Sequence, residues 1–105
     1  MSTAQAKFAV GQLIHHKRFD YRGVVYDVAP CFKGTEDWYG QMAVTKPPRD
    51  RPWYHVLVDN SDLKTYVAER NLEPDASGEP VRHPELDFHF VDLTRGTYVP
   101  RAKSN

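Results

Sequence analysis

The sequence is poor in cysteine. Cys31 is its single cysteine, so no disulfide can form within the chain, and such usage suits a reducing compartment. No apolar run approaches the roughly 20 residues of a membrane-spanning helix. The first residues, MSTAQAKFAVGQ, also lack the basic and apolar regions of a secretory signal. We therefore expect a cytoplasmic protein that does not contact a membrane.

The sequence also lacks an excess of charge. Its 14 Lys and Arg residues balance 14 Asp and Glu residues, so the formal net charge is zero. This weakens a nucleic-acid interpretation, because phosphate binding relies on clustered cations. One stretch is locally basic, HHKRFDYR at 15–22, where Lys17, Arg18 and Arg22 outnumber Asp20. Such a turn is either a solvated loop or a phosphate-binding element.

Motifs for catalysis and metal binding are missing as well. The chain has no GxSxG, no glycine-rich phosphate loop and no paired-glycine nucleotide fingerprint. Cys31 is expected to be a buried, inert thiol rather than a nucleophile, because a reactive thiolate needs an electropositive neighbourhood. The five histidines have no compact metal-ligand spacing: His15, His16, His55, His83 and His89. We therefore expect no enzymatic activity, no cofactor and no metal site.

The chain does contain a series of short β-strand signals, cut apart by eight prolines and by clusters of Gly, Asn and Asp. Its 105 residues allow one domain. In the long connection at 31–50, the section EDWYGQMAV predicts a short helical turn. The chain is expected to leave the sheet at Leu72 to Pro74. Strands are predicted at 8–16, 22–28, 53–58 and 63–68, the last two forming a hairpin.

Side-chain alternation assigns faces to two of these strands. In 22–28, Val24, Tyr26 and Val28 are expected on one face. In 53–58, the clearest strand, Trp53, His55 and Leu57 share one face and three further apolar residues share the other. Both faces of 53–58 are therefore covered, or one of them is a contact surface. Trp53 is predicted to lie in the core, with an aromatic platform for bases or peptides as the alternative. His55 is expected to be half-buried and bonded to a backbone group.

The composition changes after Pro74. EPDASGEPVRHPELD reads as an extended linker, and 84–90 predicts a short helix with proline in its first turn. Three residues are expected to anchor this tail: Leu86, Phe90 and Tyr98. We divide the chain into a disordered N-terminus (1–7), a β-barrel (8–74) and an extension that packs back on the barrel and frays at its end (75–105). The predicted fold is mostly β, a small SH3-like barrel of four to five antiparallel strands, with a meander sandwich as the alternative.

Several segments, taken in order, resemble a known family: VGQLIHHKRFDYRGVVYDVAP, EDWY, RPWYHVLVD, TYVAERNLEP, GEPVRHPEL and YVPR. They are similar to the hemimethylated-DNA-binding YccV-like family, whose stand-alone bacterial members are the heat-shock HspQ proteins. The resemblance spans 8–100, and RGVVYDVAP, PWYHVLVD and TYVAERNL are its most specific parts. Ala29 departs from it, since an acidic residue is expected there more often.

The resemblance implies a non-catalytic β-barrel that self-associates and has two roles. One is binding of DNA methylated on one strand. The other is modulation of an ATP-dependent protease that degrades the replication initiator and other substrates.

Two functions are therefore open. The first is a protein-binding modulator of proteolysis, because aromatic residues on loops are typical of protein interfaces. Its candidate contact residues are Trp38, Tyr39, Tyr54 and Tyr66. The second is binding of hemimethylated DNA, with cations that contact phosphates. Its candidate residues are Lys17, Arg18, Arg22, Lys46, Arg49 and Arg51. The expected partners are the protease and its substrates, hemimethylated DNA and further copies of the chain.

Overall fold

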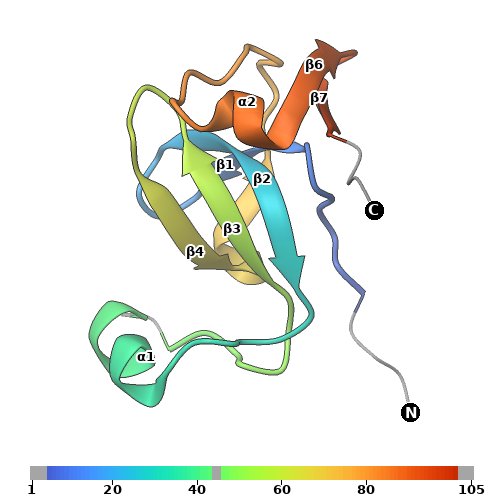
Figure 1. Cartoon of the computed structure of the whole chain (residues 1–105). Coiled ribbons are helices and arrows are strands. Elements are labelled where there is room, and N and C mark those ends of the chain that lie inside the picture. The colour runs from blue at the N-terminus through green and yellow to red at the C-terminus, as the bar shows by residue number, and fades with distance from the viewer. Residues whose placement is uncertain (1–4, 44–45, 102–105) are drawn as a thin grey trace.

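A five-stranded antiparallel sheet forms the centre of the molecule (Figure 1). The computed structural model describes residues 5–43 and 46–101. The sheet has the order β4-β3-β2-β1-β5, so β4 and β5 are its two edges. The mostly β fold predicted from the sequence is confirmed. The strands are β1 (Leu13–His16), β2 (Arg22–Ala29), β3 (Trp53–Val58), β4 (Lys64–Ala68) and β5 (Leu72–Pro74).

The first strand is shorter than predicted. Gly11 has a φ of +95°, in the left-handed region that favours glycine. Its N–H donates to the Val25 carbonyl, and its carbonyl accepts from the Tyr98 N–H, both at 2.8 Å. A Cβ at this position would overlap the Tyr98 carbonyl oxygen. The chain therefore bends at Gly11, and β1 begins at Leu13 rather than at residue 8.

The second strand contains a β-bulge. Val25 pairs with Val56 and Asp27 pairs with His55, so Tyr26 is an extra residue between them. A bulge reverses the alternation of side chains. Val28 accordingly packs with the cluster around Val25, not with the cluster that receives Tyr26. The prediction that Val28 shares a face with Val24 and Tyr26 is wrong for this reason.

The hairpin predicted over 53–68 is confirmed, with β3 and β4 in antiparallel register from Trp53↔Ala68 to Leu57↔Lys64. The prediction that the chain leaves the sheet at Leu72 to Pro74 is wrong, because these residues form a strand of the sheet. A 3₁₀ helix, η1 (Glu69–Asn71), reverses the direction of the chain, and β5 then pairs antiparallel with β1. The sheet thus gains a fifth strand that is only three residues long.

The long connection before β3 contains the predicted helix, α1 (Glu36–Met42). Thr35 caps it, and its hydroxyl accepts from the Trp38 N–H at 3.1 Å. Cys31 lies ahead of α1 and is partly exposed, which corrects the expectation of a buried thiol. The structure does not describe residues 44–45.

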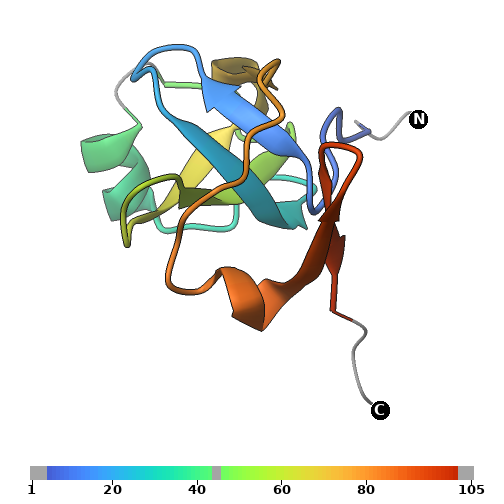
Figure 2. The same cartoon turned by 90° about the horizontal axis from the view of Figure 1, so that it is seen from above.

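The C-terminal extension forms α2 (Leu86–His89), which confirms the helix predicted there, and a hairpin of β6 (Phe90–Thr94) and β7 (Thr97–Pro100) that the sequence analysis missed. Phe90 and Tyr98 are buried, and Leu86 packs against the same cluster. Viewed from above, the hairpin lies beside the N-terminal segment (Figure 2), where Thr97 bridges to Gln12. Of the ends predicted to be disordered or frayed, residues 1–4 and 102–105 lie outside the described part of the chain.

Side chains pack on both faces of β3. Tyr54 and Val56 lie in a cluster on the inner face with Phe8 and Ile14. The outer face is covered at each end: Leu57 packs under the extension, and Trp53 packs against α1. The predicted faces of β3 and the core position of Trp53 are confirmed. Between the C-terminal extension and α1, the outer face of β3 stays partly open.

Candidate functional site

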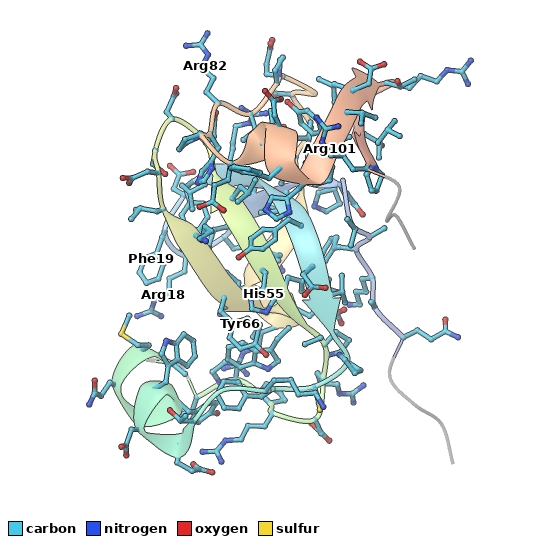
Figure 3. All side chains as sticks on the ribbon, viewed as in Figure 1. Arg18, Phe19, His55, Tyr66, Arg82 and Arg101 are labelled. Atoms are coloured by element: carbon cyan, nitrogen blue, oxygen red, sulfur yellow. The ribbon has the colours of Figure 1, made fainter. Side chains whose placement is uncertain are left out.

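A groove of about 330 Å³ follows β4, the edge strand, and we call it the β4 groove. All five residues of β4 line it, together with the β1–β2 turn on one side and α1 on the other. In Figure 3, Arg18 and Phe19 lie beside the edge of β4, and His55 and Tyr66 lie between the extension and α1. The full lining is His16, Arg18, Phe19, Tyr21, Tyr26, Trp38, Met42, Ala43, Pro47, Trp53, His55, Lys64, Thr65, Tyr66, Val67, Ala68 and Asn71.

The floor of the β4 groove is the open part of the outer face. His55 stacks on Tyr66 with ring centroids 4.5 Å apart, and it tilts against Tyr26 at 5.7 Å. The structure gives His55 these ring contacts in place of the expected backbone hydrogen bond. Partial burial raises the pKa of both tyrosine hydroxyls, so they stay neutral hydrogen-bonding groups at physiological pH. The floor is therefore aromatic and half-exposed, and its two tyrosines carry no charge.

The α1 wall presents Trp38 and Met42 to the groove. The Trp38 ring meets Tyr66 edge-on at 5.7 Å and stacks on Phe32 at 5.8 Å. The Met42 side chain is 61% exposed although it is apolar. Methionine is flexible and polarisable, which suits a surface that adapts to different partners.

The opposite wall is the β1–β2 turn, which His16 holds in shape. Its buried Nδ1 accepts from the backbone N–H groups of Arg18 (3.1 Å) and Phe19 (3.0 Å). Burial, helped by the nearby charges of His15 and Arg18, lowers the pKa of His16, and the neutral ring can act as this acceptor. Phe19 stacks on His16 at 4.9 Å and is still 62% exposed.

Two of the predicted cationic DNA contacts are engaged in ion pairs. The Arg22 guanidinium binds Asp59 and Asp75, each at 3.0 Å, and donates to the Glu79 carbonyl at 2.6 Å. These contacts tie the linker to the sheet, and the hydrogen bond to Asp75 is the main reason that the pKa of Arg22 is raised. Arg49 pairs with Glu36 at the start of α1.

The other four cationic candidates do not come together in one cluster. Lys17 and Arg18 are exposed on the β1–β2 turn. Lys46 lies 5.5 Å from the Tyr39 ring, beside Arg49 at 3.9 Å from the same ring. Arg51 lines a second, smaller concavity next to η1, together with two cations that the sequence analysis did not select: Lys7 and Arg70.

Of the four aromatic candidates for protein binding, two line the groove and two are buried. Trp38 and Tyr66 line the β4 groove. Tyr39 and Tyr54 are buried instead, which corrects their selection as surface residues. The Tyr39 hydroxyl donates to the Pro47 carbonyl, and the Tyr54 hydroxyl donates to Glu69, each at 2.5 Å. Burial is the larger cause and the hydrogen bond to the Glu69 carboxylate the smaller one, and together they strongly raise the pKa of Tyr54.

Sequence reasoning missed several residues that line the groove, among them the large apolar or aromatic side chains of Phe19, Tyr26 and Met42. No pattern in the sequence separates an exposed phenylalanine in a turn from a buried one, since soluble proteins expose many apolar atoms. Among residues 5–43 and 46–101, no three His, Cys, Asp or Glu side chains are grouped so that they could hold a metal ion. In the same part of the chain, no helix is both long enough and apolar enough to cross a membrane.

The antiparallel strand order β4-β3-β2-β1-β5 and the aromatic groove along its edge strand define the chain as a small β-domain with a groove on its surface. The family model described as hemimethylated DNA-binding protein YccV like matches residues 6–97. The chain therefore belongs to the YccV-like family, and the resemblance found in the sequence is confirmed.

Proposed function

We propose that this protein is a non-enzymatic modulator of ATP-dependent proteolysis, and that it acts by holding a segment of another protein in the β4 groove. The observation that carries the proposal is the exposure of Phe19 and Met42 on opposite walls of a groove with an aromatic floor. Large aromatic and methionine side chains are enriched where proteins bind each other. Exposed together around a concavity, they indicate a binding surface rather than scattered surface residues.

The charges around the groove favour a protein ligand over a nucleic acid. Arg18 and Lys64 are the charged residues that line it apart from histidines. Lys64 already pairs with Glu85, with Nζ 3.2 Å from Oε2. Neutralising several phosphates needs more free cations than these. A peptide needs apolar contact area and a few polar contacts, which the groove offers.

The proposed partners are an ATP-dependent protease and its substrates, among them the replication initiator, and the proposed compartment is the cytoplasm. The family resemblance adds self-association. Light scattering measures this separately from proteolysis.

The test is a degradation assay with purified protease, ATP and the replication initiator. We expect added protein to change the rate of initiator loss, with an effect that saturates as its concentration rises. Phe19→Ser should reduce the effect several-fold, because it removes one exposed wall of the groove. Phe88→Ser is the matched control: Phe88 is 76% exposed and lies on α2, outside the groove. The proposal fails if the parent protein leaves the rate unchanged, or if both variants behave alike.

Hemimethylated DNA binding is the second candidate function, and the family itself favours it. The exposed side chain of Phe19 lies next to Lys17 and Arg18 in the β1–β2 turn. An apolar group beside two cations is suited to contact a base methyl group while the cations bind phosphates. Anisotropy titrations with hemimethylated, fully methylated and unmethylated duplexes test it. Equal affinity for all three duplexes would remove the specific claim.

A further inference from the structure

The backbone of β4 is paired on one side only. The residues on either side of β4 form hydrogen-bonded pairs with the residues opposite them: the Glu69 N–H donates to the Pro52 carbonyl, and the Val58 N–H donates to the Leu63 carbonyl. In an antiparallel ladder every second residue forms such a pair. Between Leu63 and Glu69, Thr65 and Val67 therefore direct their backbone groups toward β3. The backbone groups of Lys64, Tyr66 and Ala68 must then point away from it.

The outer edge of β4 is open over part of its length. Ala68 is 3% exposed, so its backbone is covered by its surroundings. Lys64 is exposed and Tyr66 is half-buried. Within residues 5–43 and 46–101, no hydrogen bond joins the outward backbone groups of these two residues to another segment. The backbone of Lys64 and Tyr66 therefore offers two N–H donors and two carbonyl acceptors to a ligand in the β4 groove.

An unprotected edge strand is uncommon, because it is a template for pairing with another chain. Proteins usually shield such an edge with a charge, a proline, a bulge or a covering segment. Of these, β4 carries the charge of Lys64, and that charge is paired with Glu85. The two walls of the groove leave a channel beside the edge of β4. The exposed apolar side chains of Phe19 and Met42 form the two rims of this channel. The edge and the channel together have the features of a β-augmentation site.

We infer that the β4 groove binds an extended protein segment as an added strand, hydrogen-bonded to the backbone of Lys64 and Tyr66. The inference rests on the proposed function and names the form in which the protein ligand is recognised. Side chains of an added strand alternate between two faces. One set would contact Tyr66 and Trp38, and the other would contact the wall formed by Tyr21 and Phe19.

The charge of the groove specifies the segment further. Its charged lining residues are both cations: Lys64, which already pairs with Glu85, and Arg18. Among the lining residues that the structure describes, there is no Asp or Glu. A segment with alternating apolar residues and acidic flanks therefore complements the groove. Backbone hydrogen bonds do not depend on sequence, so such a site can accept many different unfolded segments. That breadth suits a protein that presents various substrates to a protease.

The test uses three fluorescein-labelled peptides of about ten residues, the span of a long strand. In each, valine and tyrosine alternate with threonine, and glutamates flank both ends. One peptide is unmodified. The second carries N-methyl groups on one alternate set of backbone amides, and the third carries them on the other set. Only one alternate set of amides can face β4 in an added strand. Anisotropy titrations of the full-length chain compare their affinities.

We expect the unmodified peptide and one methylated peptide to bind alike, and the other methylated peptide to bind at least about ten-fold more weakly, since it leaves edge groups unpaired. A peptide in which lysines replace the glutamates should also bind more weakly. Equal binding of all three original peptides would overturn strand addition and leave the proposed function intact. No binding, while Phe19→Ser still alters initiator degradation, would overturn only the strand inference. The loss of both effects would overturn both proposals.

A matched pair of variants tests the same edge from the protein side. Lys64→Ala and Lys64→Pro remove the same ammonium group, but only the proline removes the outward N–H. Proline is tolerated in an edge strand where its nitrogen faces outward, and thermal melting checks that both variants fold. We expect Lys64→Pro to bind the unmodified peptide about ten-fold more weakly than Lys64→Ala. Equal affinities would count against the inference. So would a homodimer that Lys64→Pro dissociates, because a second copy would then occupy the edge.

Discussion

Replacing Trp53 with alanine tests the packing that shapes the β4 groove. The indole is 2% exposed and its Nε1–H donates to the Pro48 carbonyl at 3.1 Å. Rings of the α1 segment and β4 surround it, including Phe32 at 4.9 Å and Tyr66 at 5.1 Å between centroids. Trp53→Ala therefore empties the centre of this cluster and leaves the carbonyl of Pro48 without its donor.

The expected cost is about 3–5 kcal/mol for a buried tryptophan. A domain of this size has a free energy of unfolding of about 5–15 kcal/mol, so the variant would lose a large part of its stability. A loss of about 4 kcal/mol lowers Tm by about 16–32 °C, at about 4–8 °C for each kcal/mol.

Circular dichroism melts and urea titrations measure this change. Phe88→Ala is the control, since its side chain is 76% exposed and should shift stability by less than about 0.5 kcal/mol. If Trp53→Ala melted within about 5 °C of the parent, the indole would not be part of the core. The α1 wall of the groove would then lack the support that the structure assigns to it.

Three further predictions concern charge. Hydrogen bonds to Asp20, at 2.6 Å, and to Glu73, at 2.7 Å, raise the pKa of His15. The stability that this histidine contributes is therefore fully present below pH 6.5 and is lost as the pH rises through the raised pKa, so His15→Gln should remove that component from Tm measured across pH 5 to 8. Burial alone would raise the pKa of Asp75, but the hydrogen bonds from Arg22 and Ser77 hold it below its usual range. The stability that Asp75 contributes is present above about pH 4 and is lost as the pH falls through the lowered pKa. Asp75→Asn should therefore lower the free energy of unfolding by about 1–3 kcal/mol at pH 7. It should also make that free energy depend less on pH below about pH 4. If Lys17 and Arg18 carry DNA binding, the slope of log K against log salt should be about −2 and should shrink by about one in Lys17→Ala. Arg95→Ala, on the distant β6–β7 turn, should leave that slope unchanged.

The hairpin over 53–68 could be predicted because its signals are local. Alternating β-formers at 53–58 are followed by turn residues, and a second strand comes directly after. Other elements depend on contacts between distant segments. The bend at Gly11 is fixed by the Tyr98 amide, and β5 exists because η1 directs it onto β1. The bulge at Tyr26 has no clear sequence signature, yet it moves Val28 to the other face.

The β6–β7 hairpin did have a local signal that the sequence analysis overlooked. Its loop is Arg95-Gly96, and both residues have positive φ values, 54° and 77°. Two such residues between paired strands form the type I′ turn of a tight hairpin. Here the glycine supplies the conformation, and the flanking Thr94 and Thr97 pair directly.

The candidate site could be predicted only in part. The place of Trp38 in the long loop and the phenol of Tyr66, which needs water or a hydrogen-bond partner at its tip, favour surface positions, and both side chains line the groove. Tyr54 was selected on the same grounds, but its hydroxyl finds a partner in Glu69 inside the protein. The sequence cannot reveal such a partner, because the two residues meet only through the β3–β4 hairpin and η1. Likewise, the ion pairs of Arg22 with Asp59 and Asp75 arise from long-range contacts.

Site-specific photocrosslinking tests most directly whether the β4 groove holds a protein ligand during proteolysis. A photoreactive benzoylphenylalanine placed at position 19 or at position 88 would be irradiated in a reaction that contains the protease, ATP and the replication initiator. Both positions carry an exposed phenylalanine, but only Phe19 lines the groove. We predict that position 19 crosslinks to the initiator or to the protease and that position 88 does not. Equal crosslinking from both positions, or crosslinking from position 88 alone, would contradict the account.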